Sequence, residues 1–314
     1  MKKLTALLLS AVLALALPMT TAFAEGRTAP EDKKIIENDA AGVVTQFRKY
    51  DAKFWDAESP EPGTVVKMEY TTDVYGEPVN NWLNVYLPYG YDETKQYDIL
   101  YFFHGTNETP DSFISDARAK NCLDNMIETG TANPFIMVFP TYYYDYETRA
   151  TDKDLFAEEM RKDIMPLVES TYSTYAPTPD TAGFEASRDH RAMSGYSQGS
   201  HACWVALNHL LDTARWWLPL SGSSASAEEI KACIEAQGKN SNDFFIYLGT
   251  GGPRDIAYEG IVGLVKDMVA DPDFFSFGND LHTNNVYATI SNEVHQTLIG
   301  RYYLYNAFCD GLMK

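Results

Sequence analysis

The chain has 314 residues, of which 45% are hydrophobic and 22% charged, and 44 Asp and Glu against 25 Lys and Arg give a net charge of −19. This composition can bury a large core and excludes an intrinsically disordered chain. The acidic balance argues against nucleic acid and against an anionic membrane surface as partners, because both are bound through clustered Lys and Arg.

The N-terminus has the pattern of a secretory signal peptide. Lys2 and Lys3 precede an apolar run over residues 4–17, and the small residues Ala22 and Ala24 follow it. The apolar run is too short to cross about 30 Å of hydrocarbon. We therefore expect residues 1–24 to be removed, and the mature protein to be secreted without a membrane anchor.

The rest of the chain divides at a Pro- and Gly-containing stretch that ends at Gly63. Residues 25–63 are charged and weakly patterned, which predicts an extension wrapped on the surface that could include one helix. Residues 64–314 form one domain of catalytic size. This domain begins with two alternating apolar and polar segments, 65–72 and 82–87, which predict an antiparallel hairpin turning near Gly76.

After the hairpin, short apolar runs alternate with helical patterns. Continuous apolar runs are typical of strands covered on both faces. The alternation predicts an α/β fold, a mostly parallel central sheet with helices on both faces. The expected strands are 99–103, 135–140, 192–196, 216–221, 244–249 and 286–290, and the expected helices are 112–129, 152–171, 198–211, 227–236 and 297–312.

A serine lies on a sharp turn between an expected strand and an expected helix. Gly195, Ser197 and Gly199 form the pattern G-x-S-x-G, in which the glycines let the backbone bend closely and lift the serine hydroxyl clear of the sheet. We interpret Ser197 as a nucleophile. The alternative is a glycine-rich turn in which Ser197 only caps the following helix.

A serine nucleophile requires a histidine base and an acid that orients it. In this kind of fold the chain order is serine, acid, histidine, and the histidine follows the last strand. His295 fits that position. Asp255 is the first carboxylate after the preceding strand and is the expected acid, with Glu259 in reserve. The remaining histidines precede strands or lie on the helix behind the serine: His190, His201, His209 and His282.

Two backbone N–H groups are needed to stabilise the oxyanion that forms when such a serine attacks a carbonyl carbon. One is expected from Gln198, directly after the nucleophile, and the other from Thr106, in the loop after strand 99–103. Gly105 lets that loop approach closely, although an ordinary tight turn would look the same. His104 is expected to make structural hydrogen bonds rather than to act as a second base.

Tyrosines follow the strand 135–140 at the same edge of the sheet as the serine. Tyr142, Tyr143 and Tyr144 could flank an aromatic group or a sugar ring of a ligand, or could form a loop packed on itself. Both interpretations stay open.

The cysteines are too widely spaced for a compact zinc site, and the proposed chemistry needs no metal or organic cofactor. An exported protein could oxidise them, but buried free thiols fit the apolar helical surroundings equally well. The cysteines are Cys122, Cys203, Cys233 and Cys309.

Several separated motifs resemble carbohydrate esterase family 1, especially bacterial feruloyl esterase domains attached to xylanases. These motifs occur in the family's order along residues 65–308. They are 83–91, His104-Gly105, 139–141, 186–191, the G-x-S-x-G turn around Ser197, 218–222, 255–259, and His295 followed by 302–307. The resemblance implies an α/β-hydrolase with Ser197, Asp255 and His295 as triad. It also implies a secreted esterase that removes hydroxycinnamoyl or acetyl groups from plant cell-wall polysaccharide.

Departures from the family pattern bear on the acyl group. Gln198 and Ser200 stand where the family usually has Met and Gly, so a polar side chain lies beside the expected oxyanion site. The first alternative is accordingly an acetyl-xylan or broad short-acyl esterase. A non-catalytic carbohydrate-binding protein on a hydrolase scaffold is the alternative from another class.

Overall fold

The computed structural model describes residues 28–31, 34–49, 51–222 and 225–314. The expected signal peptide, residues 1–24, lies outside the described residues. The centre of the fold is an eight-stranded sheet in the order β10-β9-β8-β7-β5-β6-β4-β3. Its strands are β3 Thr64–Thr72, β4 Val79–Leu87, β5 Asp98–Phe103, β6 Phe135–Phe139, β7 Arg191–Tyr196, β8 Trp216–Leu220, β9 Phe245–Thr250 and β10 Val286–Ile290.

The neighbouring strands β6, β5, β7, β8, β9 and β10 all pair in parallel. At the other edge of the sheet, β4 pairs antiparallel with both β6 and β3. The predicted hairpin and mostly parallel sheet are therefore confirmed. All parallel strands end at the same edge, so the loops that follow β5, β7, β9 and β10 converge there. This is the edge that carries Ser197.

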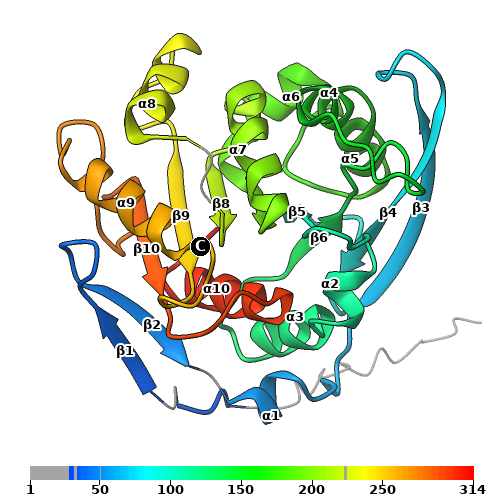
Figure 1. Ribbon diagram of the computed structural model, residues 1–314. Coiled ribbons are helices and arrows are strands. Elements are labelled where there is room, and N and C mark those ends of the chain that lie inside the picture. The colour runs from blue at the N-terminus through cyan, green and yellow to red at the C-terminus, as the bar shows by residue number, and fades with distance from the viewer. Residues whose placement is uncertain (1–27, 32–33, 50, 223–224) are drawn as a thin grey trace, which may run out of the picture.

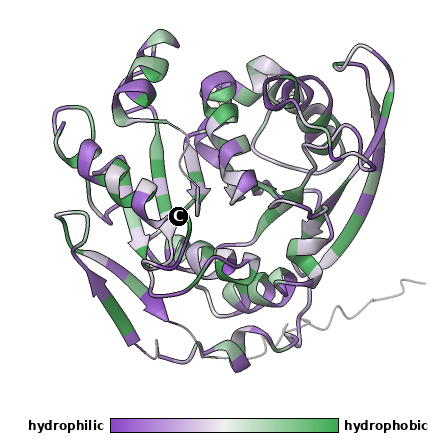
Figure 2. Ribbon diagram, viewed as in Figure 1, coloured by the Kyte–Doolittle hydropathy of each residue, from purple (hydrophilic) through white to green (hydrophobic). Residues whose placement is uncertain are grey.

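Helices cover both faces of the sheet, as predicted, and Figure 1 shows α7 and α4 on one side with α10 and α3 on the other. A hydrophobic core lies on each face of the sheet, and successive residues of a strand point alternately into one core and the other. Ile99 and Tyr101 of β5 pack under α7, for example, whereas Leu100 and Phe102 pack against α10. Figure 2 accordingly shows long hydrophobic stretches along the strands. The helices are α2 Ser112–Ser115, α3 Ala119–Glu128, α4 Lys153–Glu159, α5 Met165–Thr171, α6 Thr181–Ala186, α7 Gln198–Leu210, α8 Ala227–Ala236, α9 Tyr258–Val269 and α10 Thr297–Cys309.

Two expected helices are interrupted. The segment 112–129 breaks into α2 and α3 because Arg118 adopts a left-handed conformation with φ of 49°. The segment 152–171 contains one π-helical turn, Met160–Ile164, before Pro166 near the start of α5. Proline has no N–H to donate to the preceding turn, and the wider turn accommodates it. Helix α9, which the sequence analysis did not predict, includes Gly260 and Gly263, and glycine weakens a helical pattern.

Part of the N-terminal extension is built into the core. Strands β1 Lys34–Asn38 and β2 Thr45–Lys49 pair antiparallel, and α1 Ala52–Trp55 follows. Phe47 and Trp55 are fully buried in the same core as α10. Figure 1 shows β2 beside β10, where the Gln46 amide donates to the hydroxyl of Tyr287 over 3.0 Å. This hairpin was not predicted, since its residues alternate too weakly to reveal it.

Among the helices of the described residues, none combines the length and the apolar character needed to cross a membrane. The described ranges also contain no group of three or more His, Cys, Asp or Glu side chains placed to hold a metal ion.

Candidate active site

Ser197 lies on a strained turn between β7 and α7, with φ of 56° and ψ of −116°. A Cβ atom on Gly195 would stand 2.1 Å from the carbonyl oxygen of Gly199, and one on Gly199 would stand 2.0 Å from the carbonyl oxygen of Phe103. Both distances are impossible for a side chain, so only glycine fits either position. A non-glycine residue with positive φ is unusual and costs about 1–3 kcal/mol, which the surrounding packing must supply.

His295 lies in the loop between β10 and α10, and the fold brings it to the serine. Its Nε2 is 2.9 Å from Ser197 Oγ, within hydrogen-bonding distance. The imidazole is half-buried, with the Tyr196 ring 5.1 Å from its centre. An imidazole in this position can accept the serine proton when the hydroxyl attacks a carbonyl carbon.

Asp255 completes a hydrogen-bonded line from Ser197. Its Oδ1 is 2.7 Å from His295 Nδ1 and also accepts the amide of Ala257 over 2.9 Å. Its Oδ2 accepts the amide of Gly251 over 2.8 Å and the hydroxyl of Ser221 over 3.0 Å. The reserve candidate, Glu259, is exposed on α9 and takes no part in this network.

The carboxylate of Asp255 stays ionised although only 4% of the residue is exposed. Burial by itself raises the pKa of this carboxyl, but hydrogen bonds from His295, Ala257 and Gly251 outweigh it, and the pKa lies below its usual value. An ionised acid fixes the proton on His295 Nδ1, because a carboxylate can only accept. His295 Nε2 is then free to accept the serine proton.

Ser221 also contacts the triad, although from the sequence it stood out only as part of the family motif 218–222. It follows β8, the strand between the serine strand β7 and the acid strand β9, and is itself in a left-handed conformation with φ of 50°. The sequence signal that could have identified Ser221 is its position directly after a buried strand, at the sheet edge that carries Ser197. The Ser221 hydroxyl donates to Asp255 Oδ2, whereas His295 contacts Oδ1.

The other histidines lie away from this line. His190 pairs with Asp98 at 2.7 Å and stacks on Tyr175, beside the start of β7 rather than its end. His209 pairs with Asp154 on the surface. His104 is buried, and its two ring nitrogens contact the Gly105 carbonyl and the Thr141 hydroxyl, both at 2.8 Å.

The two expected oxyanion donors sit in suitable local structure. Gln198 is the first residue of α7, where backbone N–H groups have no intrahelical acceptor and the helix dipole favours negative charge. Thr106 is exposed in the loop after β5, and its amide donates to no acceptor within the described residues. The backbone beside it is closely held, since Gly105 N donates to Glu108 Oε2 over 2.7 Å.

The structure places the tyrosine run largely in the core. Tyr142 is 1% exposed and Tyr143 is 5% exposed, so neither ring face is open to a ligand. The Tyr142 hydroxyl donates to the carbonyls of His104 and Gly105, and the Tyr143 hydroxyl accepts the amide of Asn107. Tyr144 is half-buried against Tyr75. The first two tyrosines therefore support the loop after β5 rather than present a stacking surface.

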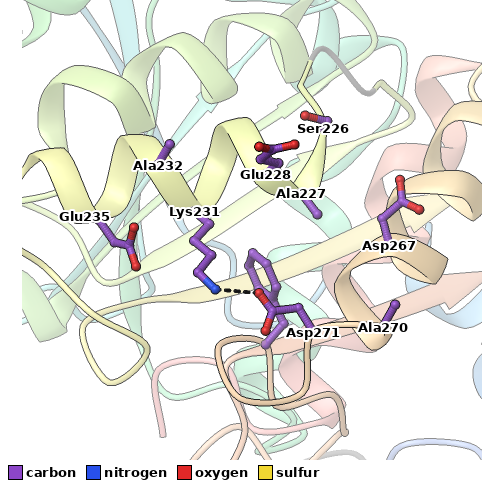
Figure 3. Close-up of a pocket in the computed structure, with 10 residues that line it drawn as sticks. Ser226, Ala227, Glu228, Lys231, Ala232, Glu235, Asp267, Ala270 and Asp271 are labelled. Carbon is purple, nitrogen blue, oxygen red and sulfur yellow. Dashed lines mark hydrogen bonds and ion pairs between the residues drawn. The ribbon is translucent and has the colours of Figure 1, made fainter.

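A large hollow in the described surface, about 640 Å³, lies between α8 and α9 and not at the serine. Figure 3 shows Lys231 reaching across it to Asp271, at a distance of 2.6 Å. The lining carries further acidic side chains, Glu228, Glu235 and Asp267, and none of Ser197, Asp255 or His295. This hollow is therefore separate from the Ser197 site.

Comparisons with known proteins agree with this geometry. The model of the Esterase family ("Putative esterase") matches residues 80–212. A mutant of the feruloyl esterase module from Clostridium thermocellum, solved with sinapinate, is 30% identical, has a TM-score of 0.75, and is aligned over 84% of this chain and 93% of its own. A ferulic acid esterase from the fungus Anaeromyces mucronatus, 19% identical with a TM-score of 0.59 over 83% of this chain and 95% of its own, shares the fold.

Among curated proteins, endo-1,4-beta-xylanase Y from Acetivibrio thermocellus is 34% identical over 257 residues, which are 79% of this chain and 23% of that protein. An endo-1,4-beta-xylanase/feruloyl esterase from Xylanibacter ruminicola is 30% identical over 158 residues, 47% of this chain and 20% of that protein. The chain thus spans less than a quarter of the length of these relatives.

The fold and the family match define a carboxylic-ester hydrolase of the α/β-hydrolase class. More narrowly, the chain belongs to carbohydrate esterase family 1, with the bacterial feruloyl esterase domains. The family resemblance read from separated sequence motifs is confirmed.

Proposed function

We propose that this protein is a secreted serine esterase that hydrolyses hydroxycinnamoyl (feruloyl) esters on plant cell-wall xylan. The observation that carries the proposal is the unbroken hydrogen-bonded line from Ser197 Oγ through His295 to Asp255, with contacts of 2.9 and 2.7 Å. Its members come from three loops at one edge of the sheet, and a purely structural serine would not need them.

The reaction follows from these contacts. His295 Nε2 accepts the proton of Ser197 as Oγ attacks the ester carbonyl, and Asp255 stabilises the imidazolium that forms. The tetrahedral intermediate collapses, His295 donates its proton to the departing alcohol oxygen, and an acyl-enzyme remains. Water, activated by the same imidazole, then releases the acid and regenerates Ser197. No step requires a metal or an organic cofactor.

The amides of Gln198 and Thr106 stabilise the negative oxygen of both tetrahedral intermediates. One such donor contributes about 2.7–4 kcal/mol to transition-state stabilisation in studied hydrolases. The position of Gln198 at the first turn of a 13-residue helix adds the helix dipole to its N–H group.

The substrate class rests on the relatives. The solved bacterial relative is a feruloyl esterase module complexed with sinapinate, and two curated relatives are named as xylanases, one of them also as a feruloyl esterase. Two exposed apolar side chains that could contact an acyl group lie near triad residues in the chain. Ile256, directly after Asp255, is 83% exposed, and Leu298, three residues after His295, is partly exposed. The partner would be an esterified cell-wall polysaccharide.

One observation favours a second candidate, an acetyl-xylan or short-acyl esterase. The rings of Tyr142 and Tyr143 are buried and cannot stack on a feruloyl group, and an acetyl group needs no such surface.

A substrate panel separates these candidates. Methyl ferulate, methyl sinapate and acetylated xylan would be incubated with the wild type and with Ser197→Ala, with melting curves to show that both are folded. We expect release of ferulate by the wild type and a loss of roughly 10⁴-fold or more in the variant. Rapid deacetylation of xylan without ferulate release would establish the second candidate instead.

Secretion is a separate part of the proposal and rests on the leader pattern of residues 1–24. Expression of the full chain in a bacterial host with an intact export system, followed by intact mass measurement of the exported protein, tests it. We expect a mature chain that begins at Glu25. A full-length protein retained inside the cells would contradict this part alone.

A further inference from the structure

Both peptide groups of Gly105 are held by side chains, a feature that the proposed triad does not explain. On the carbonyl side, Gly105 O lies 2.8 Å from His104 Nδ1 and accepts the Tyr142 hydroxyl over 3.1 Å. The same hydroxyl hydrogen is shared with the His104 carbonyl at 2.9 Å. Tyr142 also stacks on the His104 ring, with centroids 4.5 Å apart.

The protonation of His104 is fixed by its neighbours. Burial lowers the pKa of His104 to about 4, so the ring is neutral at physiological pH. A carbonyl oxygen can only accept, so Nδ1 carries the proton and donates to Gly105. Nε2 then accepts from the hydroxyl of Thr141, which itself accepts the amide of Tyr143.

On the amide side, Gly105 N donates to Glu108 Oε2 over 2.7 Å. The second oxygen of this carboxylate, Oε1, accepts the hydroxyl of Thr297. Thr297 is the first residue of α10 and stands two residues after His295. The Glu108 side chain therefore links the loop that carries the expected oxyanion donor to the segment that carries the base.

We propose that Tyr142 and Glu108 are positioning residues for ester hydrolysis, which hold the Gly105–Thr106 peptide so that the Thr106 N–H faces the reacting carbonyl oxygen. In a trans peptide the C=O of Gly105 and the N–H of Thr106 point in opposite directions. Hydrogen bonds that fix this carbonyl on the protein side therefore aim the N–H outward, where it has no acceptor among the described residues. The inference rests on the oxyanion role given to Thr106 in the proposed function.

The contribution of Glu108 is geometric rather than electrostatic. A negative carboxylate near a developing oxyanion would oppose it, so charge alone gives no reason for an acid in this position. A side chain with two acceptors, by contrast, can bridge a backbone N–H and a hydroxyl at once. A glutamine keeps this capacity, because its amide oxygen can accept from Gly105 and its NH₂ can donate to Thr297.

The test compares kinetics with the binding of a boronic acid, whose tetrahedral adduct with a serine places an oxygen where the oxyanion forms. For Tyr142→Phe and Glu108→Ala we expect kcat to fall about tenfold and the Ki of phenylboronic acid to rise about tenfold, with KM within twofold. Glu108→Gln is expected to stay within threefold of the wild type in both. Tyr70→Phe removes another largely buried hydroxyl, one that donates to Glu159, and serves as the matched control with unchanged constants.

The outcomes distinguish failure of the proposed esterase function from failure of the positioning role alone. If the wild type does not bind the boronic acid, or Ser197→Ala hydrolyses the ester at the wild-type rate, the proposed function itself is wrong. If the triad behaves as expected but folded Tyr142→Phe and Glu108→Ala keep wild-type kcat and Ki, only the positioning role is overturned. Should Glu108→Ala not fold, Thr297→Val removes the same link, and parallel changes of about threefold in kcat and Ki are expected; unchanged values would overturn the role.

Discussion

The Ser221 hydroxyl donates over 3.0 Å to Asp255 Oδ2, whereas His295 contacts the other oxygen of this carboxylate, Oδ1. The amide of Gly251 also donates to Oδ2, over 2.8 Å. Together with the amide of Ala257, which donates to Oδ1, three donors besides His295 orient the acid. We therefore expect substitutions to have graded effects, in which loss of the acid abolishes most activity and loss of one supporting donor is partly compensated by the others.

We expect Asp255→Asn to lower kcat about 10⁴-fold, because the amide favours the wrong tautomer of His295. Ser221→Ala is expected to lower kcat only about three- to tenfold, since Gly251 still holds Oδ2. Ser194→Ala is the matched control, because Ser194 is a buried serine that donates to the Leu218 carbonyl over 3.0 Å and stands outside the network. Steady-state kinetics on one ester measure all three; equal losses for Ser221→Ala and Asp255→Asn would argue against the graded account.

We expect alanine substitution to affect stability very differently at Gly199, in the serine turn, and at Gly263, in α9. Gly199→Ala would place Cβ 2.0 Å from the Phe103 carbonyl oxygen, and backbone cannot move aside cheaply, so we expect a loss of more than about 4 kcal/mol in the free energy of unfolding. Gly263→Ala in α9 meets nothing within 4 Å and replaces glycine in a helix, which is expected to be neutral or to stabilise by up to about 1 kcal/mol. Urea denaturation of both variants checks this; similar stabilities would contradict the described turn.

Acid stability follows from the buried His104. Its pKa is about 4 in the folded protein, below the usual value of 6.5, so between these values the unfolded chain binds more protons and folding stability falls as the pH drops. The loss from this group amounts to about 3 kcal/mol between pH 6.5 and 4. We expect His104→Gln to show a shallower dependence of the unfolding free energy on pH over that window. An unchanged slope would mean that His104 is protonated or exposed in the native protein.

The N-terminal hairpin is expected to contribute to the stability of the whole domain. Phe47 is fully buried against α10, and the backbone of its neighbour Arg48 accepts from and donates to the side chain of Asn306. Phe47→Ala should therefore cost about 3–5 kcal/mol, whereas Ile35→Ala, at an exposed position of β1, should change stability by less than about 0.5 kcal/mol. Thermal unfolding distinguishes the two; equal midpoints would show that the hairpin is only loosely attached.

Much of the fold could be predicted from the sequence because its signals are local. Strand β10 and helix α8 have the predicted bounds, since each is a clear run of one periodicity. The residues brought together at Ser197 follow from chain order and from the shared edge of parallel strands. The roles of Ser221 and Tyr142 could not be predicted, because each depends on a contact between distant segments, 34 residues apart for Ser221 and Asp255 and 37 for Tyr142 and Gly105.

Trapping the acyl-enzyme would show directly whether Ser197 is the nucleophile. The wild type would be mixed with an activated ferulate ester, quenched in acid within milliseconds, and analysed by intact mass and peptide mapping, with Ser197→Ala treated in parallel. We expect a mass increase of one feruloyl group, located on the peptide that contains Ser197 and absent from the variant. Turnover of the ester with no adduct on Ser197, or an equal adduct in Ser197→Ala, would contradict it.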